Sequence, residues 1–134
     1  MWPTNMKIAE VRVARPTNKL KEIEYFYCEG IGLRKIGSFS GHSGYDGLMV
    51  GLPDASYHLE FTQHEDGSPC PALTKDNLLV FYLPDKTDVE VIAGRLNAMG
   101  YGPVPPENPY WEKSGITIED PDGWRIVLMN TEGI

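Results

Sequence analysis

The sequence contains only two cysteines among its 134 residues, Cys28 and Cys70, and they lie far apart. They form no CxxC pair, the spacing typical of structural zinc sites and redox dithiols, so neither chemistry is indicated. Isolated thiols are usual in reducing compartments, whereas secreted small domains pair their cysteines. A cytoplasmic location is therefore expected.

Long apolar runs and clustered basic residues are also missing. No run approaches the roughly 20 apolar residues of a membrane helix, and the N-terminus lacks the basic and apolar regions of a signal peptide. The formal net charge is −7, from 19 acidic and 12 basic residues, whereas non-specific nucleic-acid binding needs clustered Lys and Arg. Membrane and nucleic-acid partners are therefore not expected.

What remains is the composition of an ordered globular protein. Hydrophobic residues make up 41% of the chain and charged residues 23%, which are ordinary values for such proteins. The length fits one domain, since domains of about 100 to 150 residues are the most common. We expect a single domain over residues 1–134.

An internal repeat divides this expected domain into two halves. Gly30-Ile31-Gly32 recurs 70 residues later as Gly100-Tyr101-Gly102. Two apolar segments recur in the same order, Ile8–Val13 as Leu78–Leu83 and Tyr57–Thr62 as Trp124–Met129. Self-similarity of this kind is the mark of a duplicated structural unit. Module 1 is expected at about residues 1–70 and module 2 at about 71–134.

Each half is predicted to contain a strand, a helix and three more strands. Alternating apolar residues predict strands, and apolar residues at helical spacing predict helices. For the first half the expected segments are a strand over Lys7–Val13, a helix over Leu20–Tyr27 with a Thr17 cap and a left-handed Gly30, and strands over Leu33–Phe39, Tyr45–Leu52 and Tyr57–Gln63.

The second half is predicted in the same way. Thr87 and Glu90 have capping-box spacing at the start of a helix, and the Pro-rich segment Gly102–Trp111 is expected to be a loop that packs over another part of the chain. The expected strands are Asn77–Leu83, Gly115–Glu119 and Trp124–Met129. The fold class is therefore α+β, with two tandem βαβββ modules that form a cupped mixed sheet.

These modules resemble the vicinal-oxygen-chelate superfamily, which includes glyoxalase I, extradiol dioxygenases, fosfomycin-resistance thiol transferases and bleomycin-resistance proteins. The resemblance covers nearly the whole chain. It is carried by the double βαβββ pattern, Phe26-Tyr27-x-x-Gly30-Ile-Gly32-Leu33, His58-Leu-Glu-Phe61 and Asp120-Pro-Asp-Gly-Trp-Arg-Ile-Val-Leu128. It implies a small-molecule pocket in the sheet cup and a homodimer.

The metal site that the resemblance implies is largely missing from this sequence. Alignment of the strands puts Ile8, Glu60, Leu78 and Val127 at the four ligand positions, and only Glu60 offers an oxygen to a metal. A divalent metal is the one cofactor left open, with His42, His58 and His64 as the alternative donors. The expected site is degenerate.

Polar residues on one strand are the first candidates for chemistry. Period-two alternation places His58, Glu60 and Thr62 on one face, where Glu60 and His58 could form a general acid and base pair. The alternative is that they satisfy each other's hydrogen bonds. Glu60 and His58 are the catalytic candidates, and Thr62 is a ligand-binding candidate.

Three further charged residues are ligand-binding candidates. Arg12 and Glu10 share the face of Ile8, and a guanidinium can bind a carboxylate or phosphate through paired hydrogen bonds. Arg125 is expected on the face of Val127 and could do the same. An internal ion pair between Arg12 and Glu10 or Glu60 is the alternative.

Tyr110 and Trp111 bring two large aromatic rings into the Pro-rich loop. Aromatic side chains in loops provide a rigid apolar surface on which a planar or hydrophobic ligand can stack, so both are ligand-binding candidates. Packing of the loop onto its own domain is the alternative.

Two functions of different kinds follow from these candidates. The first is a metal-free binding protein similar to bleomycin-resistance members. The second is an enzyme, either a glyoxalase-like lyase, isomerase or thiol transferase with rearranged metal ligands, or an acid–base catalyst that uses Glu60 and His58. A protein-interaction module is a third class, supported only by the tendency of such folds to dimerise.

Overall fold

The computed structural model describes residues 6–52, 54–70, 72 and 74–133. No helix in this part of the chain is long and apolar enough to cross a membrane. Its elements are, in chain order, β1 (Val11–Pro16), α1 (Leu20–Glu24), the π-helix η1 (Tyr25–Ile31), β2 (Arg34–His42), β3 (Tyr45–Gly51), β4 (Tyr57–His64), β5 (Leu78–Tyr82), α2 (Lys86–Ala98), β6 (Pro103–Val104), the 3-10 helix η2 (Pro109–Trp111), β7 (Gly115–Glu119) and β8 (Arg125–Met129).

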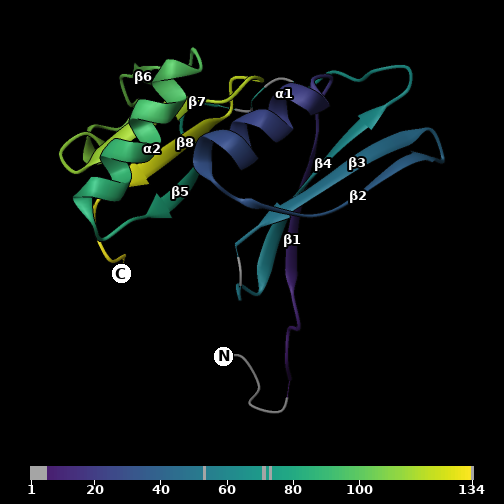
Figure 1. Ribbon diagram of the computed structural model, residues 1–134, viewed down its shortest axis with the longest axis horizontal. Helices are drawn as coiled ribbons and strands as arrows, with labels where there is room; N and C mark the ends of the chain where they lie inside the picture. Colours follow the sequence, from purple (N-terminus) through teal and green to yellow (C-terminus); the bar gives the residue numbers. More distant parts are fainter. Residues whose placement is uncertain (1–5, 53, 71, 73, 134) are drawn as a thin grey trace.

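The strands form two four-stranded sheets with the same connectivity (Figure 1). Their orders are β1-β4-β3-β2 and β5-β8-β7-β6. In each sheet the first strand pairs in parallel with the last one, and the remaining pairs are antiparallel. This arrangement confirms the tandem βαβββ fold. We call β1 to β4 with their helix module 1, and β5 to β8 with α2 module 2.

One face of each sheet packs against the helices. Leu59 and Phe61 on β4 and Ile126 and Leu128 on β8 belong to one buried cluster with side chains of α1, η1 and α2. Because side chains alternate along a strand, the intervening residues lie on the opposite face. We call these opposite faces the cup faces; they carry His58 and Glu60 in module 1 and Arg125 and Val127 in module 2.

The two modules are held together by close contact between η1 and α2 (Figure 1). A Cβ atom on Gly30 would lie 2.4 Å from Cδ2 of Leu96, so only glycine allows this approach. Arg95 completes the contact by donating hydrogen bonds to the carbonyl oxygens of Gly30 at 2.9 Å and Ile31 at 3.3 Å.

The end of the first helix differs from the prediction because of this packing. The left-handed residue that ends it is Gly32, with φ of 99°. Gly30 does not end the helix; it is required because a side chain there would clash with Leu96 of α2. Thr17 does accept a hydrogen bond from the N–H of Lys19 at 2.9 Å, but the N-cap position itself is Lys19.

The starts of β1 and α2 also differ from the prediction. Strand β1 begins at Val11 because its partner β4 begins opposite, at Tyr57; Lys7 to Glu10 precede the strand, so Ile8 does not lie beside Glu60. Helix α2 begins at Lys86, with Asp85 as N-cap accepting from the N–H of Thr87. The predicted capping box at Thr87 was therefore wrong.

Candidate functional site

A polar cluster lies on the cup face of module 1. Arg12 on β1 is directly opposite His58 on β4 in the parallel ladder, so the two side chains share a face. Nε of Arg12 donates a hydrogen bond to Nε2 of His58 at 2.8 Å, and Nη1 donates to Oε2 of Glu60 at 3.3 Å. Glu10 lies on the other side of His58, with Oε1 3.2 Å from Nδ1. Four predicted site residues are thus brought together.

These contacts define the state of His58. Because Nε2 accepts from an arginine that is always protonated, its lone pair is used and the ring proton resides on Nδ1. Oε1 of Glu10 lies 3.2 Å from Nδ1. Both ring nitrogens therefore have partners, and the residue is only 5% exposed. His58 would have to give up one of these contacts before it could exchange a proton with a ligand.

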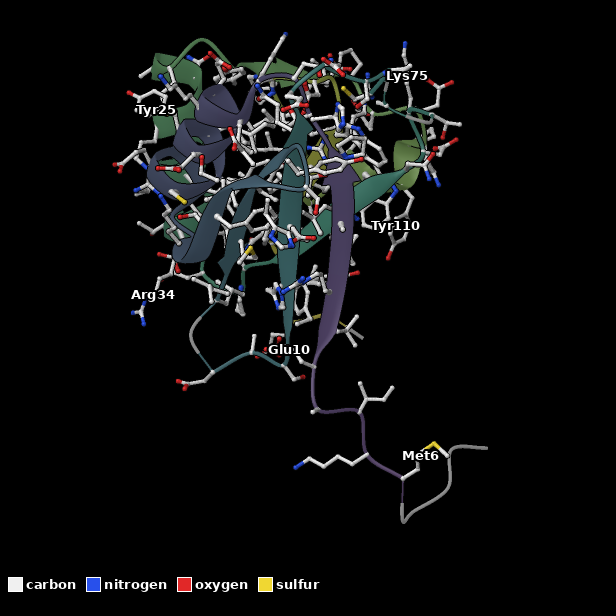
Figure 2. The ribbon with its side chains drawn as sticks, turned by 90° about the vertical axis from the view of Figure 1, so that its right-hand side faces the viewer. Met6, Glu10, Tyr25, Arg34, Lys75 and Tyr110 are labelled. Atoms are coloured by element: carbon white, nitrogen blue, oxygen red, sulfur yellow. The ribbon has the colours of Figure 1, made fainter. Side chains whose placement is uncertain are left out.

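The residues of the cluster differ in their access to solvent. The side chain of Glu10 is 58% exposed and that of Arg12 48%, whereas that of Glu60 is 13% exposed; Figure 2 shows Glu10 at the start of β1. Thr62 follows Glu60 on the same face and is half-buried. Two carboxylates, those of Glu10 and Glu60, thus share one guanidinium in this cluster.

A pocket of about 260 Å³ lies at the junction between the two modules. We call it the junction pocket. Glu60 belongs to both the polar cluster and this pocket, which places a charged carboxylate at the edge of an otherwise largely apolar cavity. Its lining consists of Val13, Arg15, Tyr27, Leu59, Glu60 and Phe61 from module 1, and Asn77, Leu78, Leu79, Trp124 and Arg125 from module 2.

Arg125 lies on the module 2 side of this pocket but is engaged within its own module. Nε is 3.1 Å from Oε2 of Glu119, and Nη1 donates to the carbonyl oxygen of Pro105 at 2.9 Å. Its side chain is only 5% exposed. Arg125 therefore ties the Pro-rich segment to the sheet, which agrees with the predicted packing of that segment.

The two aromatic candidates of this segment have different environments. Trp111 is half-buried and lines a shallow hollow with Leu78 and Val80 of β5. Tyr110 is 67% exposed and points away from the ribbon in Figure 2. Its ring meets that of Trp111 edge to face, with centroids 4.9 Å apart. Neither ring lines the junction pocket.

A second polar cluster, not predicted from the sequence, joins the modules beside the junction pocket. Arg15 on β1 forms an ion pair with Asp120 and lies 3.3 Å from Oδ2 of Asp122. The hydroxyl of Tyr27 donates to Oδ2 of Asp120 at 2.7 Å. We call Arg15, Tyr27, Asp120 and Asp122 the inter-module cluster.

Burial changes the acid–base properties of this cluster. It raises the pKa of the Tyr27 hydroxyl well above its ordinary value, and the negative charge of Asp120 raises it further. Burial also raises the pKa of Asp120, and this effect exceeds the lowering by Arg15 and by the hydrogen bond from Tyr27. The rings of Phe61 and Trp124 lie 4.8 Å and 4.9 Å from the guanidinium carbon of Arg15.

The inter-module cluster left only a faint signal in the sequence. Asp120 stands in a turn motif, and its Oδ1 does accept from the N–H groups of Asp122 at 2.9 Å and Trp124 at 3.0 Å. That local role accounts for an Asp at this position. The second oxygen, Oδ2, pairs with Arg15 from the other module. No local sequence pattern indicates this long-range contact.

The cup faces do not fit the divalent metal that the fold suggests. Among the described residues, no three His, Cys, Asp or Glu side chains are placed to hold a metal ion, so a site from His42, His58 and His64 is not formed. Val127, at the last expected ligand position, is fully buried. Beside Glu60 lies the guanidinium of Arg12, which repels a second cation at this distance.

Two family profiles match the chain. The YycE-like N-terminal domain matches residues 11–62 and the YycE-like C-terminal domain matches residues 76–130. Together they cover strands from both sheets, including the polar cluster from Arg12 to Glu60 and the turn that contains Asp120.

Similar proteins agree with these profiles. The uncharacterized protein YycE of Bacillus subtilis is 56% identical over 131 residues, which cover 98% of this chain and 94% of that protein. A solved structure of a YycE protein of unknown function from Bacillus subtilis has a TM-score of 0.92 and the same identity, with 98% and 96% of the two chains covered. It is described as a candidate glyoxalase or fosfomycin-resistance protein.

More distant structures share the fold. Trypanothione-dependent glyoxalase I of Leishmania major has a TM-score of 0.74 at 15% identity, with 94% of this chain and 88% of that one covered. TnmS3, an antibiotic-binding protein from Streptomyces sp. CB03234, has a TM-score of 0.66 at 23% identity, with 93% and 98% covered.

Proposed function

Because the chain belongs to the YycE-like family and has the vicinal-oxygen-chelate fold, we propose that it binds a small molecule in the junction pocket without a tightly held metal. The observation that carries this proposal is the position of Glu60, which lies in both the polar cluster and the pocket. A ligand in the pocket would meet apolar walls, the carboxylate of Glu60 and the side chains of Arg15 and Arg125.

The chemistry of the pocket favours a compact, mostly apolar ligand. Small-molecule sites combine hydrophobic walls with a few placed polar groups. Here Val13, Leu59 and Leu79 form walls, and the polar groups are Glu60, Asn77, Arg15 and Arg125. Since Arg12 holds Glu60 from outside the cavity, the carboxylate is presented to the ligand in a fixed position.

A protein with this fold that is known as a binding protein supports the proposal that this chain binds a ligand without converting it. TnmS3 is an antibiotic-binding protein, and at 23% identity the likeness concerns the fold alone. One scaffold can host both binding and catalysis, so the function must be argued from the site. With the metal positions replaced, binding requires fewer assumptions than catalysis.

Binding can be tested with the fluorescent dye 1-anilinonaphthalene-8-sulfonate, titrated into the full chain. Val13, which is 55% exposed, lines the pocket, so Val13→Trp is expected to fill its mouth and weaken dye binding at least about tenfold, or by ~1.4 kcal/mol. Val91→Trp on α2 is the matched control, because Val91 is 51% exposed and away from the pocket. Equal dye binding by both variants would contradict the proposal.

Metal-free acid–base catalysis by Glu60 is the second candidate. It is favoured because Oε2 of Glu60 accepts from Arg12 while the carboxylate still lines the pocket, as a general base must in order to reach a bound molecule. Once a ligand is found, a Glu60→Gln variant that binds it normally but no longer converts it would establish catalysis. Conversion unchanged in this variant would exclude Glu60 as the base.

We further propose a homodimer formed through β1. This strand lies at the edge of its sheet, and Val11 on it and Ile8 just before it are 46% and 53% exposed. Exposed apolar edges are typical of association surfaces. Light scattering coupled to size exclusion is expected to give twice the chain mass, and Val11→Lys, but not Val91→Lys, is expected to give the monomer. A monomeric native chain at high concentration would contradict this.

The organisation of the chain and its location follow from the same features. We infer one domain over residues 1–134, because the inter-module cluster joins β1 to the turn before β8. Its module boundary near residue 70 falls between β4 and β5. We also propose a cytoplasmic location, which the free thiols of Cys28 and Cys70 support.

A further inference from the structure

We propose that Arg12 is the resident cation of the module 1 cup: its guanidinium occupies the space between His58 and Glu60 where a divalent metal would bind, and excludes metals from the native chain. This assigns to Arg12 a role in ion selectivity. The proposal concerns the protein without any ligand, so it stands or fails independently of the small molecule proposed above.

The lone pairs that a metal would need are already used by Arg12. A transition metal binds the unprotonated nitrogen of an imidazole and the oxygen of a carboxylate. In this cup, Nε of Arg12 donates to Nε2 of His58 at 2.8 Å, and Nη1 donates to Oε2 of Glu60 at 3.3 Å. A metal would therefore have to displace both hydrogen bonds at once.

The other nitrogen of His58 offers no alternative. With Nε2 as acceptor, the ring proton is on Nδ1, which faces Oε1 of Glu10 at 3.2 Å. The ring is also buried, with 5% exposure, so its nitrogens are not presented to solvent. Glu10 beside Nδ1 thus leaves Nε2 as the nitrogen that could bind a metal, and Arg12 occupies that nitrogen.

The charge of the site makes a resident cation necessary. Glu10 and Glu60 contribute two negative charges around His58, and the chain as a whole carries a net charge of −7. Such surroundings attract divalent cations. Because the guanidinium stays protonated over the whole physiological pH range, it supplies a permanent positive charge that opposes them.

The sheet, and not only the length of the side chain, places Arg12 there. Arg12 and His58 are register partners on adjacent parallel strands, which lie about 4.8 Å apart. An imidazole at position 12 would therefore project beside that of His58, with Glu60 two residues further on the same face. Arg12→His is thus expected to convert the cup into a site with three donors.

The test is a titration of the chelator-treated full chain with Zn²⁺ by isothermal titration calorimetry, repeated with Co²⁺ by visible absorption. The native chain is expected to show no saturable site. Arg12→His is expected to bind one ion per chain at least about 100-fold more tightly, since even second-shell changes alter metal affinity by about 10- to 100-fold. The gain should vanish when His58→Ala or Glu60→Gln is added.

Two further variants separate charge from space. Arg12→Met removes the charge and leaves two donors, so it is expected to bind Zn²⁺ more weakly than Arg12→His but measurably. Arg12→Lys keeps the charge and is expected to bind none. Circular dichroism confirms the fold of each variant, and Arg12→Met carries the test if Arg12→His does not fold.

Three results would overturn the proposal. One is a native chain that takes up one Zn²⁺ per chain and loses it with His58→Ala. Another is Arg12→Lys gaining as much affinity as Arg12→Met, which would show that positive charge is not what excludes the metal. The third is a folded Arg12→His variant without any bound ion.

Discussion

Replacing Arg15 by leucine should destabilise the protein more than replacing an exposed arginine by leucine. The substitution leaves Asp120, which is fully buried, and Asp122, which is 7% exposed, without their cation. Removing one partner of a buried ion pair costs about 3 to 5 kcal/mol, because the remaining charge is uncompensated. A leucine would keep apolar contact with Phe61 and Trp124, so lost packing adds little.

The assay is urea unfolding of the native and Arg15→Leu chains, supported by thermal melts. For a chain of this length, about 4 °C of melting temperature corresponds to 1 kcal/mol, so the expected decrease is about 12 to 20 °C. Arg34→Leu is the control, because Arg34 is exposed and extends away from the sheet in Figure 2; its effect should stay within about 0.5 kcal/mol.

The cost of Arg15→Leu should also depend on pH. In the native chain the pKa of Asp120 is already raised by burial, and Arg15 lowers it, so removing Arg15 raises it further. A carboxyl group whose pKa is higher in the folded chain than in the unfolded chain stabilises the fold at pH values below its unfolded pKa. That stabilisation is lost as the pH rises through its folded pKa. The cost should therefore be largest near neutral pH and shrink as the pH falls toward about 4.

Two outcomes would refute this reasoning. A loss of less than about 1 kcal/mol at neutral pH would place the cluster in the class of surface ion pairs. A loss that is the same at about pH 7.5 and about pH 4.5 would show that uncompensated ionisation of Asp120 is not its cause.

Two other substitutions and an alkylation experiment test the packing and the buried polar groups. Gly30→Ala should cost about 1 to 3 kcal/mol in urea unfolding, because its Cβ would come 2.4 Å from Leu96, whereas Gly94→Ala, with open space around it, should be neutral or stabilising. Thr117→Val should raise stability by about 1 kcal/mol, since the Thr117 hydroxyl is buried without a hydrogen-bond partner among the described residues; a loss would mean that the hydroxyl is satisfied. In a chain with Cys28 as the only thiol, burial raises the pKa of that thiol, so alkylation should require a higher pH than in the urea-unfolded chain, and identical pH profiles would contradict this.

The fold could be predicted because its signals are local and occur twice. Alternation and turn residues placed β7 at Gly115–Glu119, the range observed, and placed the other strands within about four residues of their observed ends, except for β6. The prediction of a loop over Gly102–Trp111 was wrong for β6, because a strand of two residues is too short to show alternation. The ends of helices were harder, because Gly30 and Gly32 stand one residue apart and either could adopt the left-handed conformation. The choice depends on Leu96, which belongs to the other module.

The sequence could predict which residues of one strand share a face, but not which residues of neighbouring strands meet to form the polar cluster. Alternation placed His58 and Glu60 on one face, but which β1 residue lies beside them depends on the register between two strands. The family alignment put Ile8 at the ligand position beside Glu60, whereas the ladder puts Arg12 opposite His58. The ion pair between Arg12 and Glu60, which the sequence offered as an alternative, is present at 3.3 Å. The ligand-binding roles of Arg125, Tyr110 and Trp111 stay predictions, since their observed contacts are to the chain itself.

The inter-module cluster could not be predicted, because Arg15 and Asp120 are 105 positions apart. Either residue has an adequate local explanation, Arg15 as a polar strand residue and Asp120 as a turn residue. Pairing them requires knowing how the two sheets meet, and that is decided by the packing of η1 on α2 and not by either segment.

The same cluster limits how a duplicated chain can change. Arg15 and Tyr27 come from the first half and Asp120 and Asp122 from the second, so an altered charge in one half leaves a buried charge unpaired in the other. Substitutions at these four positions should therefore be accepted together or not at all. A chimera that joins one half of this protein to the other half of a relative should fold only when both parents carry the same set.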